Sequence, residues 1–255
     1  MFRFFRKIRQ QLLNENKTVR YLKYAVGEVL LIMVGILLAL QLSDWNQTRN
    51  DRVEEQQILK GLKTEFERQL EGLKRQLSST EQKVSGIVLF MSYLSEQDKE
   101  YSNEELDSAL RSVLSGGTWD PSFSQLDTLI SSGRLDLIAN HELRTRLANW
   151  KSKVAEVLDN QVVARDYLLN TLWPLLGSKG LPIARGQATK QLNSELYTLL
   201  PELTTRQEYP DLHGDLELAN MLSIKYNLNH GSVGEIGVRI NEAKEIITII
   251  TNQIR

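Results

Sequence analysis

The chain of 255 residues has no cysteine, three histidines and five prolines. Without cysteine it cannot form disulfides, thiol nucleophiles, iron–sulfur clusters or cysteine-based zinc sites. His141, His213 and His230 leave little for metal binding or acid–base catalysis. The chain also lacks a large net charge, because 31 basic residues are balanced by 32 acidic residues. A net charge near zero argues against a nucleic-acid-binding protein.

The even balance hides a strong asymmetry along the chain. Residues 1–24 contain seven basic residues and one acidic residue, so this segment carries a charge of +6. The remaining 24 basic and 31 acidic residues give the rest of the chain a charge of −7. A basic head on an acidic body is typical of a segment that directs a protein to a membrane.

An apolar run follows the basic head. Residues 24–42 contain a single charge, Glu28, and as a helix they would extend roughly 28 Å, the thickness of a bilayer core. Tyr21 and Tyr24 at one end and Trp45 at the other resemble an aromatic belt. The sequence therefore predicts a transmembrane helix over residues 24–45.

Two alternatives compete with a retained anchor. A buried core helix would place polar residues at every second turn, and residues 29–40 have none. A cleaved signal peptide would need small residues at its cleavage site, but Gln41 occupies such a position in both possible sites. We therefore expect a single-pass protein of a bacterial inner membrane, with residues 1–23 in the cytoplasm and residues 46–255 in the periplasm.

The basic head itself has apolar residues at helical spacing, Phe5, Ile8 and Leu12. This pattern predicts a short amphipathic helix on the inner leaflet, although a plain basic flank without a helix is the alternative. In the amphipathic helix, four side chains would contact anionic lipid: Arg3, Arg6, Lys7 and Arg9.

One face of the predicted span combines a carboxylate with small residues. At 100° per residue, Glu28, Gly35, Ala39 and Asn46 fall within about 40° of one another. Gly35 and Ala39 form a small-xxx-small pair that lets two helices approach closely. The pattern favours a self-association face, and the alternative is a solitary Glu28 that reaches toward the interface.

Two blocks of the sequence resemble an uncharacterised bacterial family of single-span membrane proteins, a domain-of-unknown-function group. The first block comprises Phe4–Arg9, Tyr24-Ala25, Gly27-Glu28, Gly35–Gln41 and Trp45-Asn46, and the second runs from Leu126 to Arg144. The resemblance implies a basic head, one span and a helical outer region. It implies no activity.

Beyond the predicted span, helical periodicity dominates the sequence. A long stalk helix is expected over about residues 51–97, with an apolar stripe that is interrupted around Thr80 and with charges such as Glu65 facing water. Ser102 and Glu105 form a capping box for a helix that ends after Leu114. A short helix ends at Gly133, and Asn140 begins another helix whose apolar face extends to Val162.

The last third of the chain is expected to begin with a loop-rich region. Pro174, Gly177, Gly180 and Pro182 predict this region over about residues 174–212, with one helix near residues 190–200. A final long helix is expected over about residues 215–254. No strand pattern occurs, so the predicted fold is all-α: one transmembrane helix, a long helix and an extracytoplasmic helical bundle.

The sequence has no recognisable catalytic motif, and we expect neither enzymatic activity nor a cofactor or metal. The glycines at 231, 234 and 237 favour close helix packing over a phosphate-binding loop, and carboxylate pairs such as Glu54-Glu55 are expected on solvated faces. Trp119, Phe123 and Arg134 lie in turns and form a candidate partner or ligand site. The alternative is that they only fill the bundle.

These patterns favour a non-enzymatic membrane protein whose periplasmic bundle serves self-association or binds an envelope protein. The partners would be the membrane, a second copy or another envelope protein, and no nucleic acid. A periplasmic ligand-sensing module that signals through a separate membrane partner is the alternative. A buried polar pocket in the body would favour sensing, and an exposed apolar stripe would favour a protein partner.

Overall fold

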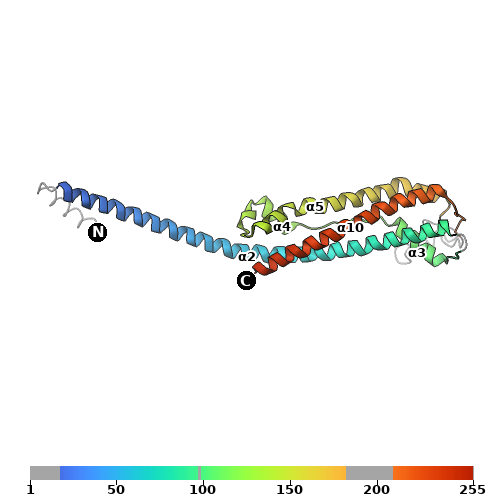
Figure 1. The fold of residues 1–255 in the computed structure, drawn as a ribbon, viewed down its shortest axis with the longest axis horizontal. Helices are drawn as coiled ribbons and strands as arrows, with labels where there is room; N and C mark the ends of the chain where they lie inside the picture. The colour runs from blue at the N-terminus through green and yellow to red at the C-terminus, as the bar shows by residue number, and fades with distance from the viewer. Residues whose placement is uncertain (1–17, 97–98, 182–208, 255) are drawn as a thin grey trace, which may run out of the picture. The chain divides into compact units, whose positions relative to one another are not determined.

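The computed structural model describes residues 18–96, 99–181 and 209–254, and every regular element in these ranges is helical. This confirms the predicted all-α class. Figure 1 shows the elements, which are α2 (Thr18–Ser95), α3 (Asn103–Leu114), α4 (Ser124–Ser131), the 3₁₀ helix η1 (Arg134–Leu137), α5 (His141–Tyr167), the π-helical turn η2 (Leu168–Leu172), α6 (Trp173–Ser178) and α10 (Leu216–Gln253).

The predicted span and the predicted stalk belong to one uninterrupted helix, α2. The chain divides into two compact units, residues 1–55 and residues 56–255, and α2 runs through both. In the first unit, the large apolar side chains from Leu22 to Leu42 are all 52–76% exposed. This stretch is long and apolar enough to cross a membrane.

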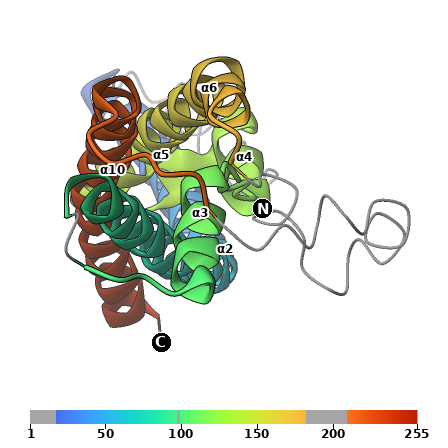
Figure 2. The same cartoon turned by 90° about the vertical axis from the view of Figure 1, so that its right-hand side faces the viewer.

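In the second unit, α5 and α10 lie alongside α2 (Figures 1 and 2). The indole nitrogen of Trp150 on α5 donates to Gln69 on α2 at 2.6 Å, and α5 runs in the same direction as α2 (Figure 1). The Gln56 amide donates to the carbonyl of Gln253 at 2.9 Å, while the amide of Gly214 bonds the carbonyl of Leu94 at 3.0 Å. Helix α10 therefore runs antiparallel to α2.

The segment from α3 to α4 returns along α2 and fills the fourth position of the bundle. Three α2 glycines permit its close approach, and a Cβ at Gly86 would lie only 2.2 Å from Cβ of Ser112 on α3. A Cβ at Gly72 would lie 2.8 Å from the indole nitrogen of Trp119. Between α3 and α4 the chain is not helical, so this position holds an irregular segment at mid-length.

The buried apolar residues form two separate clusters. The first joins α2, α4, α5 and α10, and its large members include Phe66 and Trp150, whose ring centroids are 5.3 Å apart. The second joins the C-terminal end of α2 to α3, η2 and the start of α10, around Phe90, Leu110 and Leu172. The body therefore has two apolar cores that follow one another along the bundle.

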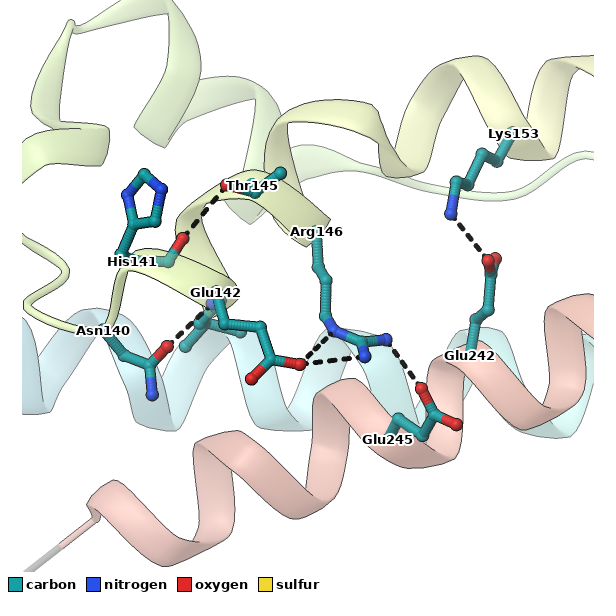
Figure 3. Close-up of polar contacts among 9 residues, drawn as sticks. Asn140, His141, Glu142, Thr145, Arg146, Lys153, Glu242 and Glu245 are labelled. Atoms are coloured by element: carbon teal, nitrogen blue, oxygen red, sulfur yellow. Dashed lines mark hydrogen bonds and ion pairs between the residues drawn. The ribbon is translucent and has the colours of Figure 1, made fainter.

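Ion pairs connect α5 to α10 at the surface (Figure 3). Arg146 pairs with Glu142 at 2.9 Å and with Glu245 at 2.7 Å, and Lys153 pairs with Glu242 at 2.6 Å. Partly exposed pairs of this kind contribute about 0–1 kcal/mol each, so they support the helix register more than the overall stability.

Local signals in the sequence correctly predicted several helix ends. The capping box of Ser102 and Glu105 is present at the start of α3. The Asn140 side chain accepts from the amide of Leu143, and the Asp215 side chain accepts from the amide of Leu218. Gly133 follows α4 with a left-handed φ of 69°, which glycine adopts without strain.

Other predictions about the body were wrong. Pro174 lies in the first turn of α6 rather than in a loop, because proline lacks an N–H and that position needs none. Val162 is 37% exposed, and Ala164 is buried in its place. A Cβ at Gly231 or Gly234 would meet nothing within 4 Å, so these glycines make no close contact within the described chain.

Two further predictions concern residues outside the described ranges. The amphipathic head, with Arg3, Arg6, Lys7 and Arg9, precedes residue 18, and the helix near residues 190–200 falls between residues 181 and 209. Both stay predictions.

Candidate functional site

A layer of buried polar side chains separates the two apolar cores. Thr80 and Lys83 come from α2, and Lys225, Asn229 and Ser232 come from α10; all five are 1–7% exposed. These residues line a cavity of about 10 Å³ together with Ser115, Gly116, Gly117, Gln161, Ala164 and Arg165. At the level of this layer, the segment between α3 and α4 that packs beside α2 is not helical. Its backbone therefore lies where a helix would supply apolar side chains.

Two lysine ammonium groups determine the chemical character of this cavity. Nζ of Lys225 donates one hydrogen bond, to the carbonyl of Ala164 at 2.9 Å. The Lys83 side chain is 7% exposed, and within the described residues Nζ has no hydrogen-bond acceptor and no ion-pair partner. Nζ of Lys83 is not among the fully buried polar atoms without a hydrogen bond, so water reaches this ammonium group.

The side-chain amide of Gln161 is a third group at the cavity with N–H donors. Oε1 of Gln161 accepts the backbone N–H of Trp119 at 2.8 Å, which fixes the amide beside the cavity. Nε2 of the same side chain is buried without any acceptor. A buried N–H group without an acceptor costs about 1–3 kcal/mol, so the layer carries an energetic penalty as it stands.

The other polar side chains direct their hydrogens elsewhere. The Thr80 hydroxyl donates to the carbonyl of Gln76 at 2.8 Å, and the Ser232 hydroxyl donates to the carbonyl of Leu228 at 2.9 Å. The amide of Asn229 donates to the carbonyl of Lys225 at 2.7 Å. These groups are satisfied by their own helices and give no negative charge to the cavity.

The electrostatics of the layer follow from this composition. Burial, with added repulsion from Lys83, lowers the pKa of Lys225 to about 8. Burial also lowers the pKa of Lys83. The guanidinium of Arg165 pairs with Asp166 at 3.3 Å, and the residues of the described ranges that line the cavity include no carboxylate. The cavity is therefore rich in donors and positive charge.

The structure places the predicted self-association face on the first unit of α2. Glu28, Gly35, Ala39 and Asn46 are all exposed, and a Cβ at Gly35 would meet nothing within 4 Å. Among the described residues of the first unit, nothing therefore covers this face. Its role in self-association stays a prediction.

The predicted site in the turns is divided between core and surface. Trp119 and Phe123 are half-buried and pack against the first core, and Nζ of Lys151 lies 5.5 Å from the Phe123 ring centroid. Arg134 is exposed on η1. Binding of a partner or ligand by these three residues stays a prediction.

One residue has a structural role that the sequence analysis missed. Glu65, expected to face water, is 3% exposed and accepts from the amides of Gln125 at 2.7 Å and Leu126 at 3.2 Å. It caps α4 from a neighbouring helix, because α4 has no side-chain cap of its own. Glu55 is also buried, at 4% exposure, beside Arg52 at 2.8 Å, so the expected solvation of the Glu54-Glu55 pair was wrong for Glu55.

The buried lysines were missed as well, although the sequence contained a signal. The apolar stripe of α2 is interrupted at Thr80, and the interruption marks the polar layer. No comparable pattern in the sequence predicts that Lys225 is buried, because lysine in a helix is usually exposed. Among the described residues, no group of three or more histidines or carboxylates could hold a metal ion.

Residues 28–170 match a family of unknown function, DUF6090. The chain belongs to this family. The match confirms the expected membership of an uncharacterised family, and it includes Lys83 and Gln161 but ends before Lys225. No curated protein and no solved structure matches the chain.

Proposed function

We propose that this DUF6090 protein is a non-enzymatic single-pass protein of a bacterial inner membrane. Its helical body would face the periplasm, where it would self-associate or bind another envelope protein. The absence of any catalytic motif in the sequence supports a non-enzymatic role. The observation that carries the proposal is the exposed apolar surface of α2.

That surface is too large for an aqueous environment. Fourteen large apolar or aromatic side chains between Leu22 and Leu42 are more than half exposed, and Glu28 is the only charge among residues 24–42. Monomeric soluble proteins rarely expose a contiguous apolar patch above a few hundred Å². A bilayer would cover all sides of this helix, whereas a protein partner would cover one side.

The proposed orientation rests on the charges that flank the span. Seven basic residues precede it, and Arg49 and Arg52 are the nearest basic residues after it. This imbalance favours a cytoplasmic N-terminus. Alkaline phosphatase fused after Arg255 should therefore be active, and a fluorescent reporter that matures only in the cytoplasm should be dark. The reverse pattern would contradict the orientation.

Self-association is proposed to use the face formed by Glu28, Gly35, Ala39 and Asn46. Gly35→Leu and Ala39→Leu should separate two packed spans, because small residues permit the close approach on which packing in lipid depends. Glu28→Gln should weaken association less than Glu28→Leu, since the amide still forms hydrogen bonds across the interface. Energy transfer between labelled full chains in bilayers would measure the effect.

Matched controls separate this face from the rest of the span. Gly27→Leu adds the same bulk about 100° away from Glu28, and Leu37→Ala changes a residue about 180° away. Both variants should associate like the natural chain. Monomeric natural chains, or equal effects of Gly27→Leu and Gly35→Leu, would refute a self-association face.

Ligand sensing is a second candidate function, because a specific observation favours it. The body contains a polar cavity lined by two buried lysines, Lys83 and Lys225, with no carboxylate among the lining residues that the structure describes. In this second candidate function, a change in the body would pass to a separate membrane partner. The chemistry of the cavity indicates the class of ligand.

A further inference from the structure

We propose that the polar layer between the two cores is a binding site for one small inorganic anion of halide size, with chloride as its physiological form. The inference deepens the second candidate function, ligand sensing. It depends neither on the membrane span nor on the orientation of the chain, because all the residues involved lie in the second unit.

The first argument is the surplus of donors around the cavity. Lys83 contributes an ammonium that donates no hydrogen bond within the described chain, and Lys225 has used one of its three N–H groups. Nε2 of Gln161 is buried without an acceptor. An anion in the cavity would accept from these side chains and so would remove the penalty of the buried Gln161 donor.

The second argument is the charge of the site. Lys83 and Lys225 come from different helices and line the same cavity, and the described residues that line it include no aspartate or glutamate. Arg165 adds a third cation at this space, and Asp166, which pairs with Arg165 at 3.3 Å, is not among the lining residues. Buried charges are normally paired, and an anion between the lysines would supply the missing partner.

The third argument is size. A cavity of about 10 Å³ for the centre of a water-sized sphere holds roughly one such species. Chloride is closer in size to a water molecule than phosphate, sulfate or a carboxylate metabolite is. The cavity therefore favours a monoatomic anion.

The test uses the full chain in detergent micelles at constant ionic strength and pH 7. Sodium chloride is replaced stepwise by sodium gluconate or sodium sulfate, and thermal unfolding is followed by circular dichroism. Chloride should raise the unfolding midpoint, and at a concentration of ten times its Kd it should shift the unfolding equilibrium about tenfold. Equal midpoints in chloride and gluconate, or equal effects of sulfate and chloride, would overturn the proposal.

Substitutions locate the effect. Lys83→Met and Lys225→Met keep the length of the side chain without its charge, and each should abolish the dependence on chloride. Lys74→Met is the matched control, because Lys74 is exposed and pairs with Glu71 at 2.6 Å. A chloride dependence of the same size in all three variants would show that the ion acts elsewhere.

Two further measurements keep the proposal testable if the methionine variants fail to fold. Gln161→Glu places a carboxylate beside the ammonium groups, so this variant should fold in gluconate and should lose its response to chloride. Crystals of the natural chain grown in bromide should show one anomalous peak between Nζ of Lys83 and Nζ of Lys225. Water at that position, or a peak only on the outer surface, would refute the site.

Discussion

The two parts of helix α2 have the same backbone conformation and opposite surroundings. From residue 22 to 50 nearly every side chain is exposed, although most of residues 24–42 are apolar. From residue 56 to 95 one stripe, including Leu62 and Leu73, is fully buried, while charges such as Glu67 and Lys74 face outward. The comparison teaches that the helical backbone does not determine the surroundings of a segment. Apolar residues on all sides make the first part long and apolar enough to cross a membrane, whereas an apolar stripe on one side packs the second part against neighbouring helices.

The strongest test of this difference is a pair of matched substitutions in the two parts of α2. Leu30→Arg with Val34→Arg should cost about 5–7 kcal/mol of insertion free energy, at about 2.5–3.5 kcal/mol for each arginine near the bilayer centre. Val53→Arg with Val88→Arg changes residues of similar exposure, 57% and 47%, and should leave insertion unchanged. The fraction of the chain that resists alkaline carbonate extraction measures both, and equal retention of the two variants would contradict a membrane span.

Truncation of a leucine should destabilise the part of α2 in the bundle and spare the apolar part, the reverse of the arginine substitutions. Leu73→Ala removes a side chain that is 0% exposed in the first core and should reduce the free energy of unfolding of the body by about 2–5 kcal/mol. Leu38→Ala removes a side chain that is 61% exposed and should leave that free energy within about 0.5 kcal/mol. Denaturation of the full chain in micelles, followed by tryptophan fluorescence, would measure both. A similar loss in both variants would erase the distinction between the two parts.

The polar layer predicts a pH dependence that the apolar part of α2 lacks. Lys225 has a pKa of about 8 in the folded chain and about 10.4 in the unfolded chain, so the unfolded state binds more protons between these values. In halide-free buffer the free energy of unfolding should therefore rise by on the order of 3 kcal/mol from pH 8 to pH 10.5. Lys83 faces the same cavity with a lowered pKa and adds to the rise.

Lys225→Met isolates this contribution. The variant should lose most of the rise in stability, while Lys74→Met should keep it. Denaturant titrations at pH 7, 8, 9 and 10 would measure the slopes. A natural chain whose stability falls across this range would contradict the lowered pKa of the buried Lys225.

The smallest expected effect concerns the cap of α4. Glu65→Ala removes the acceptor of two backbone amides, those of Gln125 and Leu126, and should cost about 1–3 kcal/mol. Glu67→Ala, on the exposed face of the same turn, should change stability by less than about 0.5 kcal/mol. Equal effects in chemical denaturation would show that Glu65 does not act as a cap.

Local signals explain what could be predicted from the sequence. Ser102, Asn140 and Asp215 mark helix starts because a helix cap uses residues three positions apart. The long apolar helix could be predicted because residues 24–42 carry one charge and have the length and composition of a membrane-spanning helix. These features depend on neighbours along the chain.

The features that could not be predicted depend on tertiary neighbours. Glu65 and Glu67 have the same charge two positions apart, and only the docking of α4 makes one of them a cap. Lys83 and Lys225 are 142 positions apart, and the antiparallel alignment of α2 and α10 brings them to one cavity. Gly86 packs closely where Gly231 does not, because only Gly86 lies opposite another helix.

The measurement that tests the membrane span most directly uses the absence of cysteine. Single cysteines are introduced at Gln10, Val34 and Thr48 of the full chain, and a membrane-impermeant maleimide is added to intact spheroplasts. The account predicts labelling of Thr48→Cys at once, labelling of Gln10→Cys only after the membrane is opened, and labelling of Val34→Cys only in detergent. Labelling of Val34→Cys in intact spheroplasts as readily as Thr48→Cys would contradict the span.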